Sequence, residues 1–428
     1  MRYEEFVELG YVPGPDELIA LYRVKPAKGL TLEDAAGRIA SESSVGTWTE
    51  VKTVTDFVRS IRARAYEING NYVKIAYKPA LFEPGNMPQI FSAIAGNIFG
   101  MKAVRSLRLE DVYWPRELVE SFPGPLYGVK GVKDILKVGK RPITATVPKP
   151  KVGLNPQEYA EAAYEIMVGG IDLVKDDENN ASMKFCKFKE RVELVLKARE
   201  KAEREIGERK GYLANITAPY GEMLRRANLV KDLGGEFVMI DILTAGWSAL
   251  QEFRRENEDL RLAIHAHRAF HAAFTRNPLH GVSMKVIAGA ARLVGVDHLH
   301  IGTVIGKLES RKSEVLALAD ILRKEEIKAC ERRRLLEKRW WNKRSVIPVS
   351  SGGLHPGLIP YVIKLLGHDL IIQVGGGVMG HPRGPLCGAR AVRQAIEAVA
   401  EGIDLEEYAK SHIELRDALS KWSFTRPV

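Results

Sequence analysis

The sequence predicts an α/β protein in which a C-terminal (β/α)8 TIM barrel follows a ferredoxin-like α+β N-terminal domain. The first observation is a strand, helix, strand, strand, helix, strand order in the N-terminal part, which is the order of the ferredoxin-like motif. The second is an alternation of β-rich and helical segments over about 250 residues, which is typical of a (β/α)8 barrel. The third is the turn-forming stretch Phe122-Pro123-Gly124-Pro125 between them. We therefore expect one domain over residues 1–124 and a second over residues 125–428.

The predicted N-terminal domain rests on local patterns. Leu18–Val24 and Asn71–Tyr77 alternate apolar and polar residues as strands do. Thr31-Leu32-Glu33-Asp34 resembles a capping box, so we expect a helix from there to about Ile39. The remaining expected segments are a strand, a helix and a strand, at Trp48–Val54, Met87–Phe99 and Ala103–Val112.

Eight β-rich segments are the predicted barrel strands: Ile143–Val147, Leu173–Asp177, Leu213–Thr217, Phe237–Ile242, Leu262–His267, His298–Thr303, Ile347–Ser351 and Leu370–Val374. Helical patterns lie between them, at Pro156–Val168, Phe188–Ile206, Tyr220–Leu233 and Ser283–Leu293, and helices continue from about Ala389. An open doubly wound sheet is the alternative architecture. It lacks support because no Gly-x-Gly-x-x-Gly turn follows the first strand.

Composition narrows the class of protein. The chain has 428 residues, of which 45% are hydrophobic and 28% charged, and no tract has low complexity. The N-terminus lacks the apolar core of a signal peptide, and no apolar run reaches the roughly 18 residues that cross a bilayer. Three cysteines lie far apart without a Cys-x-x-Cys pair, so we expect neither a disulfide framework nor a zinc knuckle. We expect a soluble, cytoplasmic protein with no membrane partner.

The net charge of +10 could indicate a nucleic-acid-binding protein, which would bind in a strongly salt-dependent way. Much of the charge lies between Glu331 and Arg344, where seven basic residues face two acidic ones. We interpret this run as a solvated helix face. We therefore expect no nucleic-acid partner.

Polar residues recur where the predicted barrel strands end. In such barrels the catalytic groups lie at these strand ends, and residues two apart on a strand share a face. Pairs at this spacing are Lys149/Lys151, Lys175/Asp177, His265/His267 and His298/His300. The seventh and eighth strands end in Ser351-Gly352-Gly353 and Gly375-Gly376-Gly377. Repetition at one end of the barrel predicts a shared site.

Lys175-Asp176-Asp177-Glu178 is the sharpest of these signals. The oxygen ligands of Asp177 and Glu178 suit Mg²⁺ with water and substrate completing an octahedral shell. Lys175 is open to two interpretations. It can form an ion pair that orients a carboxylate, or, with its pKa lowered by desolvation, it can react with CO2 to give a carbamate that serves as a third ligand.

The two glycine loops match the usual phosphate site of a (β/α)8 barrel, where free backbone N–H groups hold an anion. Arg268 can grip a second phosphate in a bidentate way. Lys307, in the glycine-bounded stretch Gly302–Lys307, has the setting of a cation on a mobile lid. Two anion sites beside a metal indicate a bisphosphate substrate whose oxygen atoms chelate Mg²⁺.

These motifs resemble those of the large chain of ribulose-1,5-bisphosphate carboxylase/oxygenase (RuBisCO), over almost the whole chain. The matching stretches are 42–49, Gly96-Asn97-Ile98-Phe99-Gly100, Pro148–Lys151, 170–179, His265–Ala269, His298-Leu299-His300, Gly306–Glu309, Ser351-Gly352-Gly353 and Gln373–Gly377. The short N-terminus and the stretch Leu354-His355-Pro356-Gly357 are similar to the archaeal, form III branch. Val147 departs from plant-type enzymes, which carry a threonine there.

The resemblance implies a role for each matching residue. Lys175 would be carbamylated by a non-substrate CO2 and would bind one Mg²⁺ with Asp177 and Glu178, and the carbamate would also be the base that starts enolisation. Lys149 would move protons, tuned by Lys151, and His267 would assist hydration. Lys307 would orient the attacking CO2. The implied substrate-binding residues are Thr47, Trp48, Gly353, Gly375 and Gly376 at one phosphate, Arg268 and His300 at the other, Ser351 at a hydroxyl, and Gly352 and Gln373 in the same loops.

The resemblance also implies a shared site. Glu42, a catalytic residue, and Thr47, Trp48 and Asn97, which bind substrate, lie in the N-terminal domain and would complete the site of a neighbouring subunit. We expect a homodimer, assembled into larger (L2)n oligomers without a small subunit. The expected activity converts ribulose 1,5-bisphosphate, CO2 and water into two 3-phosphoglycerates, with oxygenation as a side reaction, in archaeal AMP salvage. The alternative is a RuBisCO-like enolase or isomerase of sulfur salvage.

Overall fold

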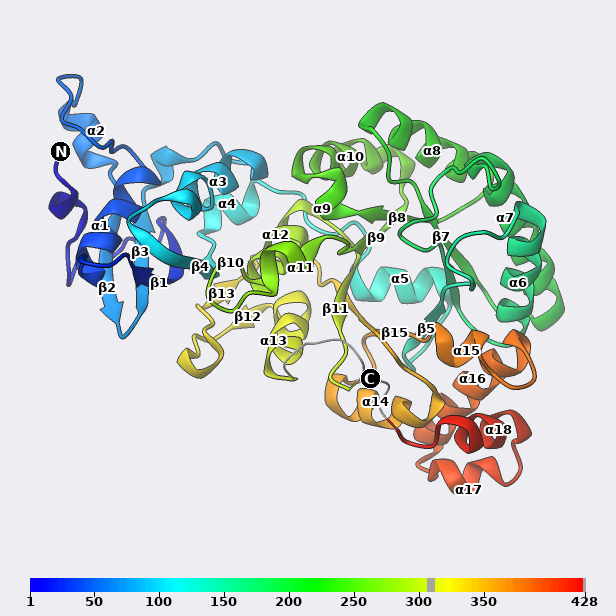
Figure 1. Cartoon of the computed structure of the whole chain (residues 1–428). Helices are drawn as coiled ribbons and strands as arrows, with labels where there is room; N and C mark the ends of the chain where they lie inside the picture. Colours follow the sequence, from blue (N-terminus) through cyan, green and yellow to red (C-terminus); the bar gives the residue numbers. More distant parts are fainter. Residues whose placement is uncertain (306–311, 426–428) are drawn as a thin grey trace. The chain divides into compact units, whose positions relative to one another are not determined.

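A computed structural model describes residues 1–305 and 312–425 of the chain (Figure 1). The chain divides into two compact units. The first contains Met1–Gly124, Phe270–Gly295 and Lys324–Lys343, and the second contains Pro125–Ala269, Val296–Arg323 and Arg344–Val428. One division therefore falls between Gly124 and Pro125, and two later segments join the N-terminal unit. The expected division into domains 1–124 and 125–428 stays a prediction, because the two compact units are not continuous in sequence.

A five-stranded sheet forms the centre of the first unit, in the order β10-β4-β1-β3-β2. Its strands are β1 (Leu18–Pro26), β2 (Arg64–Asn69), β3 (Tyr72–Tyr77), β4 (Val104–Tyr113) and β10 (Gly281–Val282). The pairs β4·β1, β1·β3 and β3·β2 are antiparallel, and β10 adds to β4 in parallel. The order β4-β1-β3-β2 with helices in the connections is that of the predicted ferredoxin-like motif.

The second strand of this sheet does not lie where the sequence pattern placed it. The prediction of a strand at Trp48–Val54 is wrong: these residues form no strand, and the side chain of Trp48 is 83% exposed. Strand β2 instead begins at Arg64 and turns into β3 through Gly70, which has a φ of +58°. Asn-Gly turns favour tight hairpins because glycine adopts positive φ without strain. The pairing with β3 thus decides the location of the strand.

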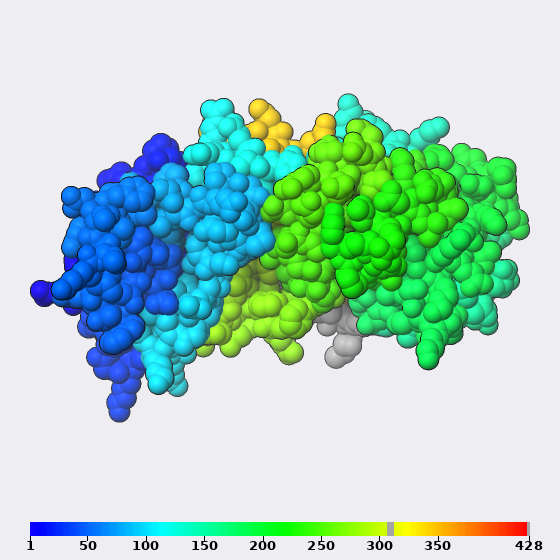
Figure 2. All heavy atoms as spheres, turned by 90° about the horizontal axis from the view of Figure 1, so that it is seen from above, coloured from blue at the N-terminus to red at the C-terminus, as the bar shows by residue number. Residues whose placement is uncertain are grey.

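The helices of the first unit cover and connect this sheet. They are η1 (Tyr3–Phe6), α1 (Leu32–Glu42), α2 (Asp56–Ser60), η2 (Pro79–Leu81), α3 (Met87–Ile94), η3 (Asn97–Gly100), α4 (Arg116–Glu120), α11 (His271–Thr275), α12 (Met284–Val294) and η4 (Glu331–Arg333). The predicted capping box is confirmed, because Thr31 Oγ1 accepts from the Asp34 N–H and the Asp34 carboxylate accepts from the Thr31 N–H. The predicted helix 87–99 is in fact two, because α3 ends at Ile94 before Gly96. In Figure 2 the yellow-green residues near 280 lie against the cyan residues near 110, as the β10·β4 pairing requires.

The basic run 331–344 is not a solvated helix face, so that interpretation is wrong. It forms a turn of 3-10 helix and a short hairpin of β12 (Glu326–Ile327) and β13 (Lys338–Arg339). Lys338 Nζ lies 2.5 Å from Asp111 Oδ2 with both side chains buried, and Arg334 lies 3.2 Å from Glu110. Since β4 supplies both carboxylates, two of the seven basic residues in this run are ion-paired inside the first unit.

A closed barrel of eight parallel strands forms the second unit, which confirms the predicted fold class. In barrel order the strands are β5 (Ile143–Thr146), β6 (Leu173–Lys175), β7 (Gly211–Asn215), β8 (Phe237–Asp241), β9 (Ala263–His267), β11 (His298–Gly302), β14 (Ile347–Ser351) and β15 (Ile371–Gln373). Each overlaps one of the eight predicted segments. The strands are buried on both faces, so they read as short apolar runs rather than as alternating ones.

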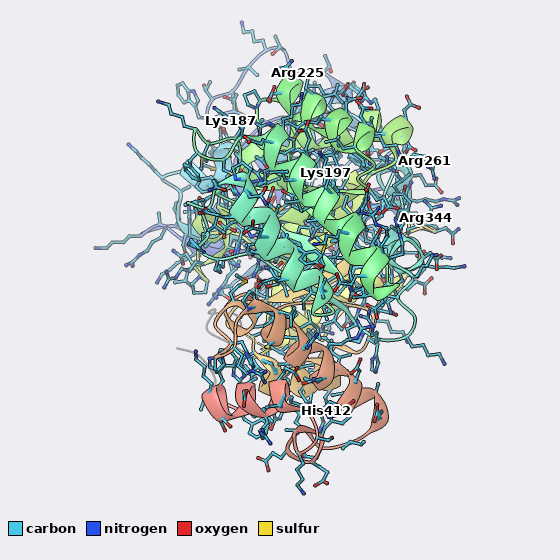
Figure 3. The ribbon with its side chains drawn as sticks, turned by 90° about the vertical axis from the view of Figure 1, so that its right-hand side faces the viewer. Lys187, Lys197, Arg225, Arg261, Arg344 and His412 are labelled. Carbon is cyan, nitrogen blue, oxygen red and sulfur yellow. The ribbon has the colours of Figure 1, made fainter. Side chains whose placement is uncertain are left out.

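Helices surround the barrel. They are α5 (Gly128–Leu136), α6 (Pro156–Val168), α7 (Phe188–Ile206), α8 (Tyr220–Asp232), α9 (Ile242–Ala245), α10 (Trp247–Leu260), α13 (Lys312–Arg323), η5 (Pro356–Leu358), α14 (Ile359–Leu366), α15 (Gly376–Met379), α16 (Pro385–Glu401), α17 (Leu405–Ala409) and α18 (Ile413–Trp422). Figure 3 shows Lys197 of α7 and Arg225 of α8 on the outer surface of the barrel, and His412 beside α18 in the C-terminal helices. Within the described ranges, no helix combines the length and apolar character that crossing a membrane requires.

Helix α5 closes the end of the barrel where the strands begin. Its residues Val132 and Leu136 are buried in one apolar cluster with Ile143, Leu173 and Phe237 from the strands. Packing of this kind fills the barrel interior, which is a core rather than a channel. The opposite end, where the strands finish, is therefore left to polar side chains.

A buried carboxylate joins the beginnings of β5 and β6. Asp172 accepts two hydrogen bonds of 2.6 Å from the Arg141 guanidinium, and others from the backbone and hydroxyl of Thr144. Burial raises the pKa of Asp172, but the hydrogen bonds and charge of Arg141 outweigh it, so the pKa lies below its ordinary value. The ion pair thus stabilises the start of two neighbouring strands.

Candidate active site

Polar side chains gather at the carboxyl ends of the barrel strands. Lys149 follows β5, Lys175 ends β6, and His267 and Ser351 end β9 and β14. Because all eight strands are parallel, these ends meet on one side of the barrel. Hydrogen bonds and close approaches connect most of them, as described below, so they form one site.

Lys175 lies at the centre of the site and is buried, with 1% of its surface exposed. Its Nζ donates to the backbone oxygen of Asp176 at 2.7 Å. Burial lowers the pKa of Lys175, and the carboxylates of Glu178, Asp177 and Asp241 only partly oppose that effect. A neutral amine is the nucleophilic form, so the environment favours the reactive state of this lysine.

Two carboxylates lie beside Lys175. Asp177 Oδ2 is 3.0 Å from Lys149 Nζ, and Glu178 Oε1 is 3.7 Å from Lys151 Nζ. Asp177 Oδ1 also accepts from the backbone and side-chain N–H groups of Asn179. Burial raises the pKa of Asp177, yet the hydrogen bond and charge of Lys149 together with the hydrogen bonds from Asn179 outweigh burial, so the pKa lies below its ordinary value. Both lysines predicted from the first strand therefore face the acidic pair.

A buried network supports this pair from below. Asp176 and Arg191 form an ion pair of 3.1 Å in which both side chains are fully buried. Asp176 also accepts from Tyr212 Oη at 2.8 Å and from the Asn215 backbone N–H at 2.9 Å. The amide of Asn215 in turn donates to the backbone oxygen of Glu178 at 3.2 Å. Asp176 thus holds the loop rather than facing the site, and its position within the acidic stretch gave no indication of this.

His267 is oriented by a carboxylate that sequence reasoning missed. Its Nδ1 lies 3.0 Å from Asp241 Oδ1, and its Nε2 lies 3.7 Å from Glu178 Oε2. Burial lowers the pKa of His267, with the hydrogen bond to Asp241 opposing it. Asp241 ends β8, so the same strand-end rule that selected His267 could have found it.

The other three histidines of the predicted pairs form a line toward Ser351. His265 Nε2 lies 2.8 Å from His300 Nε2, and His265 Nδ1 lies 3.3 Å from His298 Nδ1. At the other end, His300 Nδ1 lies 2.9 Å from Ser351 Oγ. The His300 ring also packs edge-on to His267, with 4.8 Å between ring centroids.

Three glycines in the loops after β14 and β15, Gly352, Gly353 and Gly377, occupy positions that disfavour any other residue. Gly352 and Gly353 have φ values of +117° and +72°, which disfavour any other residue. At Gly377 a Cβ would come within 2.6 Å of the Leu354 backbone oxygen, and at Gly375 a Cβ would lie 3.8 Å from Lys149 Cε. The eighth-strand loop is therefore next to the predicted proton-transfer lysine, and Gly376 begins helix α15 there.

Two further polar groups of the barrel suit a bound anion or a sugar. Arg268 is 7% exposed, and no carboxylate of the described residues lies within ion-pair distance of it. Burial lowers the pKa of Arg268 to about 10, with Glu314 opposing. Gln373 Oε1 is buried and has no hydrogen-bond partner among residues 1–305 and 312–425. The buried guanidinium of Arg268 would be neutralised by an anionic ligand.

The remaining predicted site residues lie elsewhere. Glu42 ends α1, Thr47 and Trp48 follow it, and Asn97 begins η3, all within the first unit. Lys307 lies outside the described residues, as does the motif Gly306–Glu309.

Asp177, Glu178 and unmodified Lys175 supply only part of the ligands that a divalent cation needs. In the described part of the chain, no three His, Cys, Asp or Glu side chains are grouped so that they could hold a metal ion. Asp177 and Glu178 supply two hard oxygen donors, and the buried amine of Lys175, whose pKa is lowered by burial, lies with them. A carbamate on Lys175 would supply the third anionic oxygen, so the residues present fit Mg²⁺ together with CO2.

Comparison with protein families gives two matches that together span nearly the whole chain. "Ribulose bisphosphate carboxylase large chain, N-terminal domain" matches residues 5–118, and "Ribulose bisphosphate carboxylase large chain, catalytic domain" matches residues 128–422.

Curated relatives and solved structures agree with these matches. The ribulose bisphosphate carboxylase of Pyrococcus abyssi is 52% identical over 99% of this chain and 98% of its own length, and that of Methanocaldococcus jannaschii is 48% identical over 98% and 100%. A dimeric archaeal Rubisco from Hyperthermus butylicus is 54% identical, with a TM-score of 0.94 over 99% of this chain and 100% of that one. An octameric Rubisco from Pyrococcus horikoshii, in complex with sulfate, is 50% identical, with a TM-score of 0.93 over 100% and 98%.

Proposed function

Because the chain belongs to the family of ribulose bisphosphate carboxylase large chains, we propose that its barrel site carboxylates ribulose 1,5-bisphosphate. Carbon dioxide and water are the co-substrates, two 3-phosphoglycerates are the products, and oxygenation is a side reaction. The observation that carries this proposal is the buried Lys175 beside Asp177 and Glu178, with Lys149 3.0 Å from Asp177.

The proposed cofactors are one Mg²⁺ and one activating CO2 in each site. Lys175 as carbamate, Asp177 and Glu178 would hold the ion, which supplies a Lewis acid for the oxygen atoms of the substrate. The lowered pKa of Lys175 supports this assignment, because a neutral amine is needed to attack CO2. The carbamate would also remove the proton that starts enolisation.

Four further residues would move protons or orient the reactants. Lys149 would transfer protons during enolisation and deliver the last proton to the product carbon, and Lys151 would tune it. His267 would assist addition of water, and its hydrogen bond to Asp241 fixes the orientation of its ring. A positioned acid or base typically contributes about 10² to 10⁴ in rate. Lys307 would orient the attacking CO2 from the sixth-strand loop.

The two phosphates would bind at two places. Gly353, Gly375 and Gly376, with Thr47 and Trp48 of a neighbouring subunit, would hold one. Arg268, whose guanidinium is buried, would hold the other. His300, whose two ring nitrogens contact His265 and Ser351, would line the same place. Ser351, Gly352 and Gln373 would contact the sugar between them.

The proposed active unit is a homodimer. Glu42 and Asn97 would join Thr47 and Trp48 in completing the site of the partner subunit, which explains why the first unit carries site residues of its own. The relatives from Hyperthermus butylicus and Pyrococcus horikoshii are dimeric and octameric. Dimers of this chain, alone or as (L2)n, would need no small subunit, and the proposed pathway is archaeal AMP salvage.

The test incubates purified full-length protein with Mg²⁺, ¹⁴C-labelled bicarbonate and ribulose 1,5-bisphosphate. We expect acid-stable label in 3-phosphoglycerate, with two product molecules for each bisphosphate consumed. Omission of Mg²⁺, by chelation, should remove the signal. Bisphosphate consumption without labelled phosphoglycerate would instead support a RuBisCO-like isomerase.

A further inference from the structure

Three buried histidines and one serine form a continuous line of ring-nitrogen contacts. Its order is His298, His265, His300 and Ser351, with separations of 3.3, 2.8 and 2.9 Å between the contacting atoms. His265 and His298 are fully buried, and His300 is 3% exposed. At the far end, His298 Nε2 is buried and has no hydrogen-bond partner among residues 1–305 and 312–425.

The three rings are neutral. Burial lowers the pKa of His298 to about 3, and burial together with the neighbouring charges puts the pKa values of His265 and His300 well below the ordinary value. A neutral imidazole has one N–H donor and one bare nitrogen acceptor. Each contact in the line therefore joins one donor to one acceptor, and the whole line runs in one of two directions.

The two directions differ in what they leave unsatisfied. If Ser351 donates to His300, each ring donates toward His298, and His298 Nε2 carries a buried N–H without an acceptor. If His298 donates to His265, each ring donates toward Ser351, and only a bare nitrogen remains at His298 Nε2. Buried N–H groups without partners are rarer in folded proteins than buried acceptors without partners.

We propose that the line runs from His298 to Ser351 and makes Ser351 a hydrogen-bond donor to the bound ligand. His300 Nδ1–H donates to Ser351 Oγ, so the hydroxyl hydrogen of Ser351 is free to point into the site. The ligand atom opposite Ser351 is then an acceptor oxygen. His298 and His265, which do not touch the ligand, act as positioning residues through their tautomers.

The identity of that ligand rests on the proposed function, in which Ser351 contacts the sugar of a bisphosphate. The direction of the line does not, because it is a property of the free protein. A wrong direction in an active carboxylase would sink this inference alone. The expected direction in a protein without carboxylase activity would sink the proposed function alone.

The direct test is the tautomer of each ring in full-length protein labelled with ¹⁵N-histidine, measured by long-range ¹H–¹⁵N correlation. Single His→Phe variants assign the signals. We expect protonated Nδ1 in His298 and His300 and protonated Nε2 in His265, at neutral pH. The reverse pattern, or a doubly protonated ring, would overturn the inference.

The second test compares Ser351→Ala with Ser351→Thr, since threonine keeps the hydroxyl. Loss of one hydrogen bond to the ligand should raise KM for ribulose 1,5-bisphosphate about five- to tenfold in the alanine variant, with a smaller change in kcat. The threonine variant should recover at least half of that loss on a logarithmic scale. A KM unchanged by Ser351→Ala would contradict the donor role.

Discussion

Lys175 shows how one environment changes what a residue can do. A lysine amine is ordinarily protonated, and burial among protein atoms penalises that charge. Here the penalty exceeds the attraction of the four nearby carboxylates, so the pKa of Lys175 is lowered. The sequence leaves two interpretations of this lysine open, an ion pair or a carbamate. The lowered pKa supports the proposed carbamate, because CO2 reacts with the neutral amine.

Replacing Lys175 tests this at the level of one side chain. In Lys175→Ala we expect turnover to fall by at least about 10³-fold, because both the base and a metal ligand are lost. ¹³C-bicarbonate with Mg²⁺ should also give a carbamate signal in the parent protein and none in the variant. Lys197→Ala, on the exposed face of α7, is the matched control and should keep both readouts (Figure 3). Parental turnover in Lys175→Ala would refute the carbamate role.

The barrel strands differ from one another mainly in the residues at their two ends. Both β5 and β6 are buried along their length, whereas the residues just before them form the Asp172–Arg141 pair and their last residues lead to the site. An ion pair that is buried on one side costs several kcal/mol when one partner is removed. The beginnings of these strands thus carry stability, and their ends carry chemistry.

Asp172→Asn should lower the free energy of unfolding by about 3 kcal/mol at pH 7. The folded-state pKa of Asp172 is below its unfolded value of about 3.9, so its contribution is complete above that pH and is lost as the pH falls through the folded value. The difference between parent and variant should therefore narrow below about pH 4. Urea unfolding between pH 3 and 7 measures this, with the exposed Asp232→Asn as control. A gap that stays constant with pH would show that Asp172 contributes through shape alone.

The sequence predicted helices and strands well where the local spacing of apolar residues determines them. All eight barrel strands follow from short β-rich runs between breaks, and helices such as Pro156–Val168 follow from helical spacing and caps. The strand at Trp48–Val54 failed because β-prone composition does not supply a pairing partner. The basic run failed similarly, since its partners Glu110 and Asp111 lie more than 200 residues earlier. Local composition does not predict which distant segments of the chain pair with each other.

The residues of the candidate site also fall into those that local patterns predicted and those that they did not. Strand-end spacing selects His267 and Lys149 directly, and the structure brings both to the acidic pair. Asp241 obeys the same rule but stands alone on its strand without a polar neighbour two residues away, so it gave no pair. The structural role of Asp176 depends on Arg191 and Tyr212, which are invisible from its own neighbourhood.

At the scale of the whole molecule, the proposed site residues occur in both units. In the proposed dimer, Glu42 of one subunit serves the barrel of its partner. This arrangement makes a single-chain site incomplete, and it makes activity depend on association. A symmetric dimer then has two equivalent shared sites.

Hybrid dimers test this sharing. Glu42→Gln and Lys175→Ala should each be nearly inactive alone, whereas co-expression should restore about a quarter of the parental activity, since half of the dimers are hybrids and each hybrid has one intact site. Two tags, one on each variant, isolate the hybrids for a direct assay. Hybrids without activity, from variants that each remain dimeric, would show that Glu42 acts within its own chain.

The closure of the barrel by α5 has a consequence for how such an enzyme changes over time. Val132 and Leu136 settle the packing of the barrel at the end remote from Lys175 and His267. Mutations there can raise or lower thermal tolerance while leaving the reacting groups in place, and loop mutations at the other end can alter selectivity while the core persists. Heat adaptation and catalytic adaptation are therefore separate variables in this chain, open to selection, or to an engineer, one at a time.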